Sequence, residues 1–149
     1  MANIYVDQGI DTILGVFPKN GSNFGVLYIG LFTSQSATTV PARSATSGAT
    51  PSGWTEASGT NYARQVIASG DWSAPVTDST GRKITATQVV YPAAGSGGWG
   101  VVNGFFIATQ IASGASDKII FFANFDDDTA VMINAGDILK ITASMTLLG

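Results

Sequence analysis

The sequence predicts a single all-β domain, an antiparallel β-sandwich or barrel of about six to eight strands with a short N-terminal helix and one long loop. Its 149 residues fit one domain, residues 1–149, because domains usually hold roughly 100–200 residues. Short runs rich in β-branched and aromatic residues are separated by turn signals along much of the chain. The last run alternates between apolar and polar residues, as a half-buried strand does.

Residues 4–17 carry the predicted helix. Pro18 ends the pattern, and residues 19–22 predict a turn. The helix would cover one end of the β core, or alternatively dock on a partner. Its apolar stripe, with spacings of three and four residues, consists of Val6, Ile10, Ile13, Leu14 and Phe17.

A strand is expected at residues 24–33, after which the composition changes abruptly. Residues 34–60 are almost entirely Ser, Thr, Ala, Gly and Pro, and Pro41 and Pro51 oppose regular structure. Loops longer than about 12–15 residues are uncommon in compact domains unless they are functional or disordered. Residues 34–60 are therefore either a mobile loop or an extended arm that becomes ordered on a neighbouring chain.

Further strands are expected downstream. Residues 62–68 alternate, with Tyr62, Arg64 and Val66 on one face. A flexible loop is expected at residues 93–98, and a turn at residues 134–137 precedes the final strand. The other expected strands are residues 84–91, residues 99–102 and a hairpin of residues 103–111 and 118–125. The final strand places Leu139, Ile141, Ala143, Met145 and Leu147 on one face.

Two of these strands lack a polar face. Phe105, Phe106 and Ile107 are consecutive, as are the apolar residues 119–122. A strand with one face in water would alternate. Both strands are therefore buried between two layers of the domain, or one side of them meets a second copy of the chain.

The composition excludes several classes of function. The chain has no Cys and no His, which excludes thiolate nucleophiles, disulfides, Cys or His zinc sites and Ser-His-Asp triads. A net charge of −3 and a pI near 4.5 argue against a nucleic-acid surface. No apolar run approaches the roughly 18–20 residues of a membrane span, and the N-terminus does not resemble a signal peptide.

The carboxylates do not form a convincing site. Residues 126–128 are three consecutive Asp residues that could bind a hard cation such as calcium, but a solvated acidic turn is the simpler interpretation. Glu56 is the only Glu and lies in the long loop. The chain is therefore not expected to be an enzyme or to bind a cofactor or metal. Most of the other Asp residues lie at expected turns and are expected to cap them, namely Asp71, Asp78, Asp117 and Asp137.

Aromatic residues and the long loop supply the candidate binding residues. Trp54 and Trp72 could stack on sugars, whereas Trp99, between glycines, is expected to anchor the core or an interface. The candidates for an interface are Val40, Pro41, Arg43, Pro51, Trp54, Trp99, Phe105 and Phe122.

The order of several segments resembles a family of small tailed-bacteriophage virion proteins, often labelled tail fibre proteins and in some phages acting as capsid decoration or cement proteins. The likeness covers nearly the whole chain. It is most specific in the segments Gly-Thr-x-Tyr-Ala-Arg-Gln and Ala-Gly-Asp. The segments that carry it are residues 27–33, 59–65, 99–102, 104–107 and 134–137.

This resemblance implies a non-enzymatic β-sandwich that assembles on a virion. The expected function is a capsid decoration protein that binds the major capsid protein on the outer shell, after synthesis in the host cytoplasm, and forms a homotrimer. Residues 34–60 would then reach across a seam of the capsid. The alternative is a tail-tip or tail fibre module that recognises host glycans.

Overall fold

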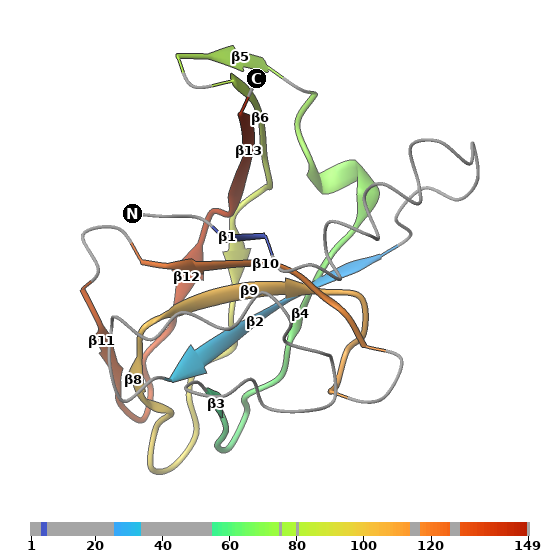
Figure 1. The fold of residues 1–149 in the computed structure, drawn as a ribbon. Helices are drawn as coiled ribbons and strands as arrows, with labels where there is room; N and C mark the ends of the chain where they lie inside the picture. Colours follow the sequence, from blue (N-terminus) through green and yellow to red (C-terminus); the bar gives the residue numbers. More distant parts are fainter. Residues whose placement is uncertain are drawn as a thin grey trace.

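The structure is a computed structural model that describes residues 4–5, 26–33, 55–74, 76–79, 81–113, 117–125 and 129–148. In this part of the chain the strands form one six-stranded sheet, two two-stranded sheets and one three-stranded sheet, all antiparallel (Figure 1). Within the same ranges, the one helical element is a single 3-10 turn, η1 (Ser69–Asp71). The all-β class is confirmed, but the described strands form no closed barrel.

The six-stranded sheet is built around β2 (Leu27–Thr33). On one edge β2 pairs with β9 (Gly104–Ala108), which pairs in turn with β10 (Ile119–Asn124) and then β1 (Ile4–Tyr5). On its other edge β2 pairs with β4 (Gln65–Ile67) along its first half and with β3 (Thr55–Glu56) at its end. The predicted hairpin is therefore confirmed as β9 and β10, and β2 is central.

The second large unit of the described fold is a long two-stranded ribbon. One arm is β6 (Gly81–Thr85) and β7 (Val89–Val90), and the other is β12 (Lys140–Ile141) and β13 (Ser144–Leu148). Thr85 pairs with Ser144, and Val89 pairs with Ile141. The first arm advances four residues between these two pairs and the second arm advances three, so the first arm holds one extra residue, as in a β-bulge. This irregularity divides each of two predicted strands in two.

Two smaller units complete the fold. β8 (Gly100–Val102) pairs with β11 (Val131–Ile133), and β5 (Val76–Asp78) pairs with β6. The sheet of β5, β6 and β13 projects away from the rest of the molecule, at the top of Figure 1. Ile84, Thr85, Ser144 and Met145 of this sheet are all of intermediate exposure, and Met145 packs against the buried core.

The middle strands of the central sheet, β2, β9 and β10, are buried on both faces. Leu27, Ile29 and Leu31 of β2 belong to the larger core cluster, whereas Phe32 packs in a second cluster with Phe106. The prediction that the runs of consecutive apolar residues are buried on both sides is confirmed by the full burial of β9 and of residues 119–123. No second copy is required to cover them.

A register shift explains the apolar run in β10. Ile119 faces Ala108 and Phe121 faces Ile107, so two residues of β10 pass one residue of β9. The bulge brings Ile120 and Phe121 into the same core cluster although they are adjacent in sequence. Strict alternation is therefore lost where the strand is most buried.

Gly30 is required by close packing across the sheet. It pairs with Phe106, and a Cβ atom at Gly30 would collide with the Phe106 ring. The ring occupies the space that a side chain would fill.

Three predictions need correction. Ile4–Tyr5 form β1 rather than the start of a helix, because their backbone pairs with Phe121 and Phe122 of β10, and residues 6–17 lie outside the described residues. Residues 55–60 are not part of a mobile loop, because β3 pairs with β2 and Ala57 is buried in the core. The strand predicted at residues 62–68 is limited to β4, since a turn at residues 59–61 precedes it.

Candidate functional site

A buried ionic network joins β3, β4 and the β9–β10 hairpin. The guanidinium of Arg64 donates from Nε and Nη2 to the two oxygens of Glu56, each at 2.8 Å, and from Nη1 to Oδ2 of Asp117, also at 2.8 Å. Nη1 also donates to the carbonyl of Gln110 at 2.8 Å. The side chains of Arg64 and Asp117 are only 3% and 2% exposed. The bidentate geometry and these partners satisfy a charge that would otherwise be costly to bury.

Arg64 also contacts the second core cluster. Its guanidinium carbon lies 4.9 Å from the centre of the Phe106 ring, the ring that fills the space at Gly30. Burial acts to lower the pKa of Arg64, but its hydrogen bonds to Glu56 and Asp117 outweigh burial and raise the pKa above its usual value. Arg64 is therefore a permanent cation within the fold.

Tyr62 extends this network to β2. Its hydroxyl donates to Oε1 of Glu56 at 3.1 Å and accepts the backbone N–H of Leu31 at 2.9 Å. Burial, followed by the negative charge of Glu56, raises the pKa of Tyr62 well above its usual value of 10.0. Its hydroxyl therefore remains protonated and serves as a structural hydrogen-bond group. It is not poised to act as a base.

Three loops are hydrogen-bonded to one another at one end of the domain. The carbonyl of Thr60 accepts the N–H of Gly95 at 2.9 Å and the indole N–H of Trp99 at 3.1 Å. The carbonyl of Ala94 accepts the N–H of Gly136 at 2.8 Å. The predicted turn at residues 134–137 is confirmed, whereas residues 93–98, expected to be a flexible loop, are tied to both other loops.

Backbone conformation at this end depends on particular residues. Asn61 adopts a φ of 68°, and its side-chain amide donates to the carbonyl of Ala93 at 3.2 Å. Gly98 has a φ of 66° and lies so close to the carbonyl of Ile133 that a Cβ atom there would collide with it. The loop arrangement thus needs both residue types at these positions.

The rings of Tyr62, Tyr91 and Trp99 pack beneath these loops. Tyr62 and Tyr91 are stacked with centroids 6.4 Å apart, and Trp99 meets them edge-on at 5.6 Å and 5.8 Å. The Tyr91 hydroxyl donates to the carbonyl of Ile29 at 2.8 Å. Desolvation by burial, followed by the charges of Tyr62 and Glu56, raises the pKa of Tyr91. Residues 59–65, 99–102 and 134–137, three of the segments that carry the sequence resemblance, are therefore held together in one frame.

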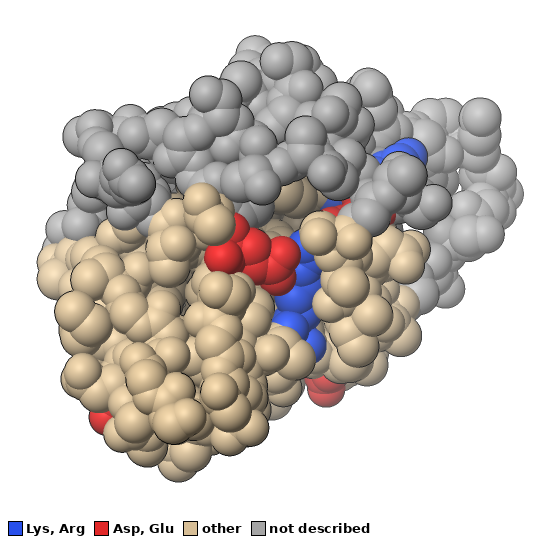
Figure 2. Space-filling view, turned by 90° about the horizontal axis from the view of Figure 1, so that it is seen from below, with Lys and Arg blue, Asp and Glu red and all other residues tan. Residues whose placement is uncertain are grey.

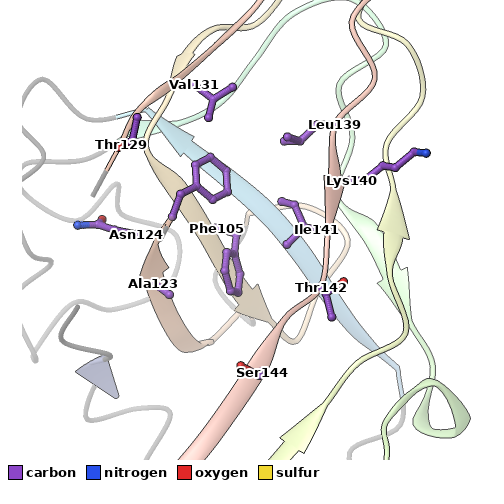
Figure 3. A pocket seen from close by; sticks show the side chains of 11 residues that line it. Phe105, Ala123, Asn124, Thr129, Val131, Leu139, Lys140, Ile141, Thr142 and Ser144 are labelled. Atoms are coloured by element: carbon purple, nitrogen blue, oxygen red, sulfur yellow. The ribbon is translucent and has the colours of Figure 1, made fainter. Parts of the chain in front are cut away.

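A cavity of about 650 Å³ lies between the central sheet and β12. Leu139 and Ile141 point from β12 toward Phe105 across the cavity, whereas Lys140 points away (Figure 3). The lining combines apolar residues with polar ones at Asn124, Thr129, Thr142 and Ser144. Such a mixed lining suits a ligand with both apolar and hydrogen-bonding groups.

The structure places the predicted interface residues in two groups. Trp99, Phe105 and Phe122 are 4–8% exposed and lie within the core of the chain, which explains their apolar character without a partner. Trp72 is half-buried and packs against the larger core cluster. Outside the described residues lie Val40, Pro41, Arg43, Pro51 and Trp54.

The predicted roles of the carboxylates have mixed outcomes. Asp71, Asp117 and Asp137 each accept a nearby backbone N–H, as expected for turn-capping residues. The side chain of Asp78 and residues 126–128 lie outside the described part of the structure. Among the side chains it describes, no group of three or more acidic residues could hold a metal ion.

Sequence reasoning missed the ion pair of Glu56 and Arg64. Glu56 was expected to lie in a mobile loop, and the alternation of residues 62–68 placed Arg64 on an ordinary strand face. The sequence did contain one signal for this pair, because Arg64 is the one charged residue in residues 62–68. Lys and Arg are almost never fully buried unless they are paired.

The described surface is sparsely charged. Viewed from below, the described surface is mostly uncharged, and acidic and basic residues lie side by side near the centre of the view (Figure 2). Val101 of β8 and Met132 of β11 face each other in register and are 41% and 55% exposed. In the part of the chain that the structure describes, no helix has the length and apolar character needed to cross a membrane.

Comparisons with other proteins identify no relative. Neither the protein-family models nor the curated protein sequences match this chain.

Proposed function

We propose that this chain is a structural protein of a tailed-bacteriophage virion, and that it decorates the capsid by binding the major capsid protein on the outer shell. The observation that carries the proposal is the convergence of residues 59–65, 99–102 and 134–137 in one hydrogen-bonded frame. These segments carry the resemblance to small virion proteins. Their structural use supports a likeness of fold between this chain and that family, and such a fold suits assembly.

The internal charges also favour a structural role. Glu56, Arg64 and Asp117 satisfy one another, and Tyr62 keeps its proton. None of these groups is left available as a general base or nucleophile. A protein that acts through binding fits this arrangement better than an enzyme does.

Exposed apolar side chains on β strands supply surface for assembly. Val101 and Met132 form a cross-strand pair, and Val66, Val76 and Val90 are each about half exposed. Val76 and Val90 lie opposite Lys83 and Lys140, whereas Val101 and Met132 pair with each other. Exposed apolar patches commonly mark interaction sites. We propose that the central sheet and the ribbon are the two layers of a sandwich, and that three copies assemble as a homotrimer after synthesis in the host cytoplasm.

Stabilisation of the capsid would follow from mass action. A protein that binds the assembled shell and not its dissociated subunits stabilises the shell by RT ln(1 + [L]/Kd). Many symmetry-related sites multiply a modest gain at each one. The chain would thus act as a cement without chemical change.

Immunogold electron microscopy tests the location. An antibody raised against this chain is applied to intact virions, and gold is expected over the heads. An antibody against the major tail protein provides the matched control on the same grids. Gold restricted to the tail end would overturn the decoration function and favour the tail-tip alternative, in which the chain binds host glycans.

A further inference from the structure

One wall of the cavity is the outer edge of β12. Four consecutive residues, 139–142, line the cavity, although successive side chains of a strand point to opposite sides. Because Leu139 and Ile141 point inward and Lys140 points away (Figure 3), the cavity meets Lys140 at its backbone. It is therefore open to the edge of this strand.

The hydrogen-bonding pattern shows which backbone groups face that edge. The N–H of Tyr91 donates to the carbonyl of Leu139 at 2.9 Å, so these two residues form a hydrogen-bonded pair. Hydrogen-bonded and non-hydrogen-bonded pairs alternate along an antiparallel ladder. Lys140 and Val90, the next pair along, therefore form a non-hydrogen-bonded pair. The N–H and C=O of Lys140 point away from β7, and in the described chain β7 is the only strand that pairs with β12.

The size of the cavity fits a short piece of strand. One residue of a strand packed between layers occupies roughly 160 Å³, given a rise of about 3.3 Å, a strand spacing of about 4.8 Å and a layer spacing of about 10 Å. A volume of about 650 Å³ therefore holds about four residues. The apolar floor at Phe105 and Ile141 suits alternate apolar side chains on that segment.

Charge argues against a second copy as the occupant. If the β12 edges of two copies paired symmetrically about Lys140, two lysines would face each other directly. Like charges in that position are destabilising, and a lysine on an edge strand is a common means of preventing self-pairing. A segment with a neutral or acidic residue opposite Lys140 meets no such repulsion.

We propose that this cavity accepts an extended segment of a neighbouring virion protein, which adds as a strand to β12 at Lys140 and inserts apolar side chains toward Phe105 and Ile141. The inference rests on the proposed function and specifies how that function is performed. Main-chain hydrogen bonds would supply affinity and the alternate side chains would supply specificity.

Lys140→Pro tests the backbone contact directly. Proline removes the outward N–H, which the fold does not use, and it is tolerated on edge strands where the N–H faces solvent. Lys140→Ala is the matched control, because it removes the side chain and keeps the N–H. Each protein is incubated with purified heads that lack this protein, and the bound fraction is measured by sedimentation. We expect Lys140→Pro to weaken binding roughly tenfold or more, and Lys140→Ala to stay within about threefold of the original chain.

Hydrogen exchange of the unaltered protein provides a second measurement that does not depend on the folding of a variant. On binding to heads, the amide of Lys140 should become protected, whereas the amides of Val89 and Val90 should change little. Protection of β7 alone would contradict the proposal.

The outcomes separate the two proposals. If the original chain does not bind heads, the decoration function fails. If it binds and both Lys140 variants bind equally well, the decoration function stands and strand addition at β12 is wrong. If Lys140→Pro instead abolishes self-association measured by analytical ultracentrifugation, the occupant is a second copy and the inference is overturned.

Discussion

At the scale of the residue, Arg64 connects separate parts of the fold. It joins Glu56 of β3, Asp117 at the end of the β9–β10 hairpin and the Phe106 ring in the second core cluster. A buried ion pair is costly to form, but it is more costly to break by removing one partner. The network therefore enforces a particular arrangement of three elements.

Replacing Arg64 should show this directly. Arg64→Met leaves Asp117 buried without its cation, and we expect the free energy of unfolding to fall by about 3–5 kcal/mol. Urea unfolding at neutral pH measures the change. Lys118→Met removes a positive charge from an exposed side chain and should change the free energy by no more than about 0.5 kcal/mol. Equal effects of the two substitutions would contradict the role given to Arg64.

Buried tyrosines should make the protein sensitive to alkali. The pKa of Tyr91 is raised above 10.0 in the fold, so above pH 10 the unfolded chain loses a proton that the folded chain retains. The free energy of unfolding should then fall with rising pH, by up to about 1.4 kcal/mol per pH unit for each such tyrosine. Urea unfolding between pH 9 and pH 11 measures the slope. Tyr91→Phe should make the slope shallower, and an unchanged slope would refute this assignment.

At the scale of the element, close packing and register shifts govern the strands. Gly30 leaves room for the Phe106 ring, and bulges in β10 and in the ribbon change which side chains face the core. Each feature interrupts a simple alternation of apolar and polar residues. The middle of the resulting sheet, β2, β9 and β10, is buried on both faces and is specified by side-chain fit.

Gly30→Ala should therefore be damaging although it adds one methyl group. The added Cβ must displace the Phe106 ring, at an expected cost of about 1–3 kcal/mol. Gly70→Ala is the matched control, because a Cβ there meets nothing within 4 Å. Thermal unfolding compares the variants, and a double-mutant cycle with Phe106→Leu should be non-additive. Additive effects would show that the two residues do not compete for this space.

The sequence predicts strands well where burial follows a local pattern. Leu139, Ile141 and Ala143 alternate as expected, and the hairpin of β9 and β10 is correct. The break between β12 and β13 was not predictable, because it arises from a one-residue difference against a partner arm far away in sequence. Ile4–Tyr5 were assigned to a helix because local periodicity carries no information about the edge of β10 to which they pair.

The candidate site was less predictable. The turn-capping Asp residues depend on neighbouring backbone groups, and three of them were predicted correctly. The pairing of Arg64 with Glu56 and Asp117, and the cavity beside β12, result from tertiary contacts. Asp117 lies 53 residues from Arg64, so no spacing rule could have paired them.

At the scale of the whole molecule, low charge and exposed apolar strands describe a protein suited to assembly. Charged residues are 11% of the chain, and the net charge is −3. Val101 and Met132 expose an apolar pair on the outer face of β8 and β11. The free protein should therefore associate readily when its net charge approaches zero.

Charge substitution on this face should separate folding from assembly. The Met132→Lys variant changes one side chain that is 55% exposed, so its thermal unfolding should resemble that of the original protein. Light scattering near pH 4.5, the pI of the original chain, should show less association. Val66→Lys adds the same charge at another exposed position, opposite the uncharged Tyr28. If both variants suppress association equally, added charge and not the β8–β11 face is responsible.

The joining of the three loops has a consequence for synthesis on the ribosome. Thr60 cannot form its hydrogen bonds until Gly95 and Trp99 have been synthesised, and Ala94 likewise requires Gly136. Strand β6 cannot pair until β13 has been synthesised. An emerging polypeptide cannot complete these pairings until residues 144–148 have been translated. Contacts this distant in sequence slow folding, and the apolar strand at residues 119–123 remains uncovered meanwhile. A lower expression level, with fewer chains synthesised at once, or a lower growth temperature should therefore improve the yield of native protein by reducing encounters between unfinished chains.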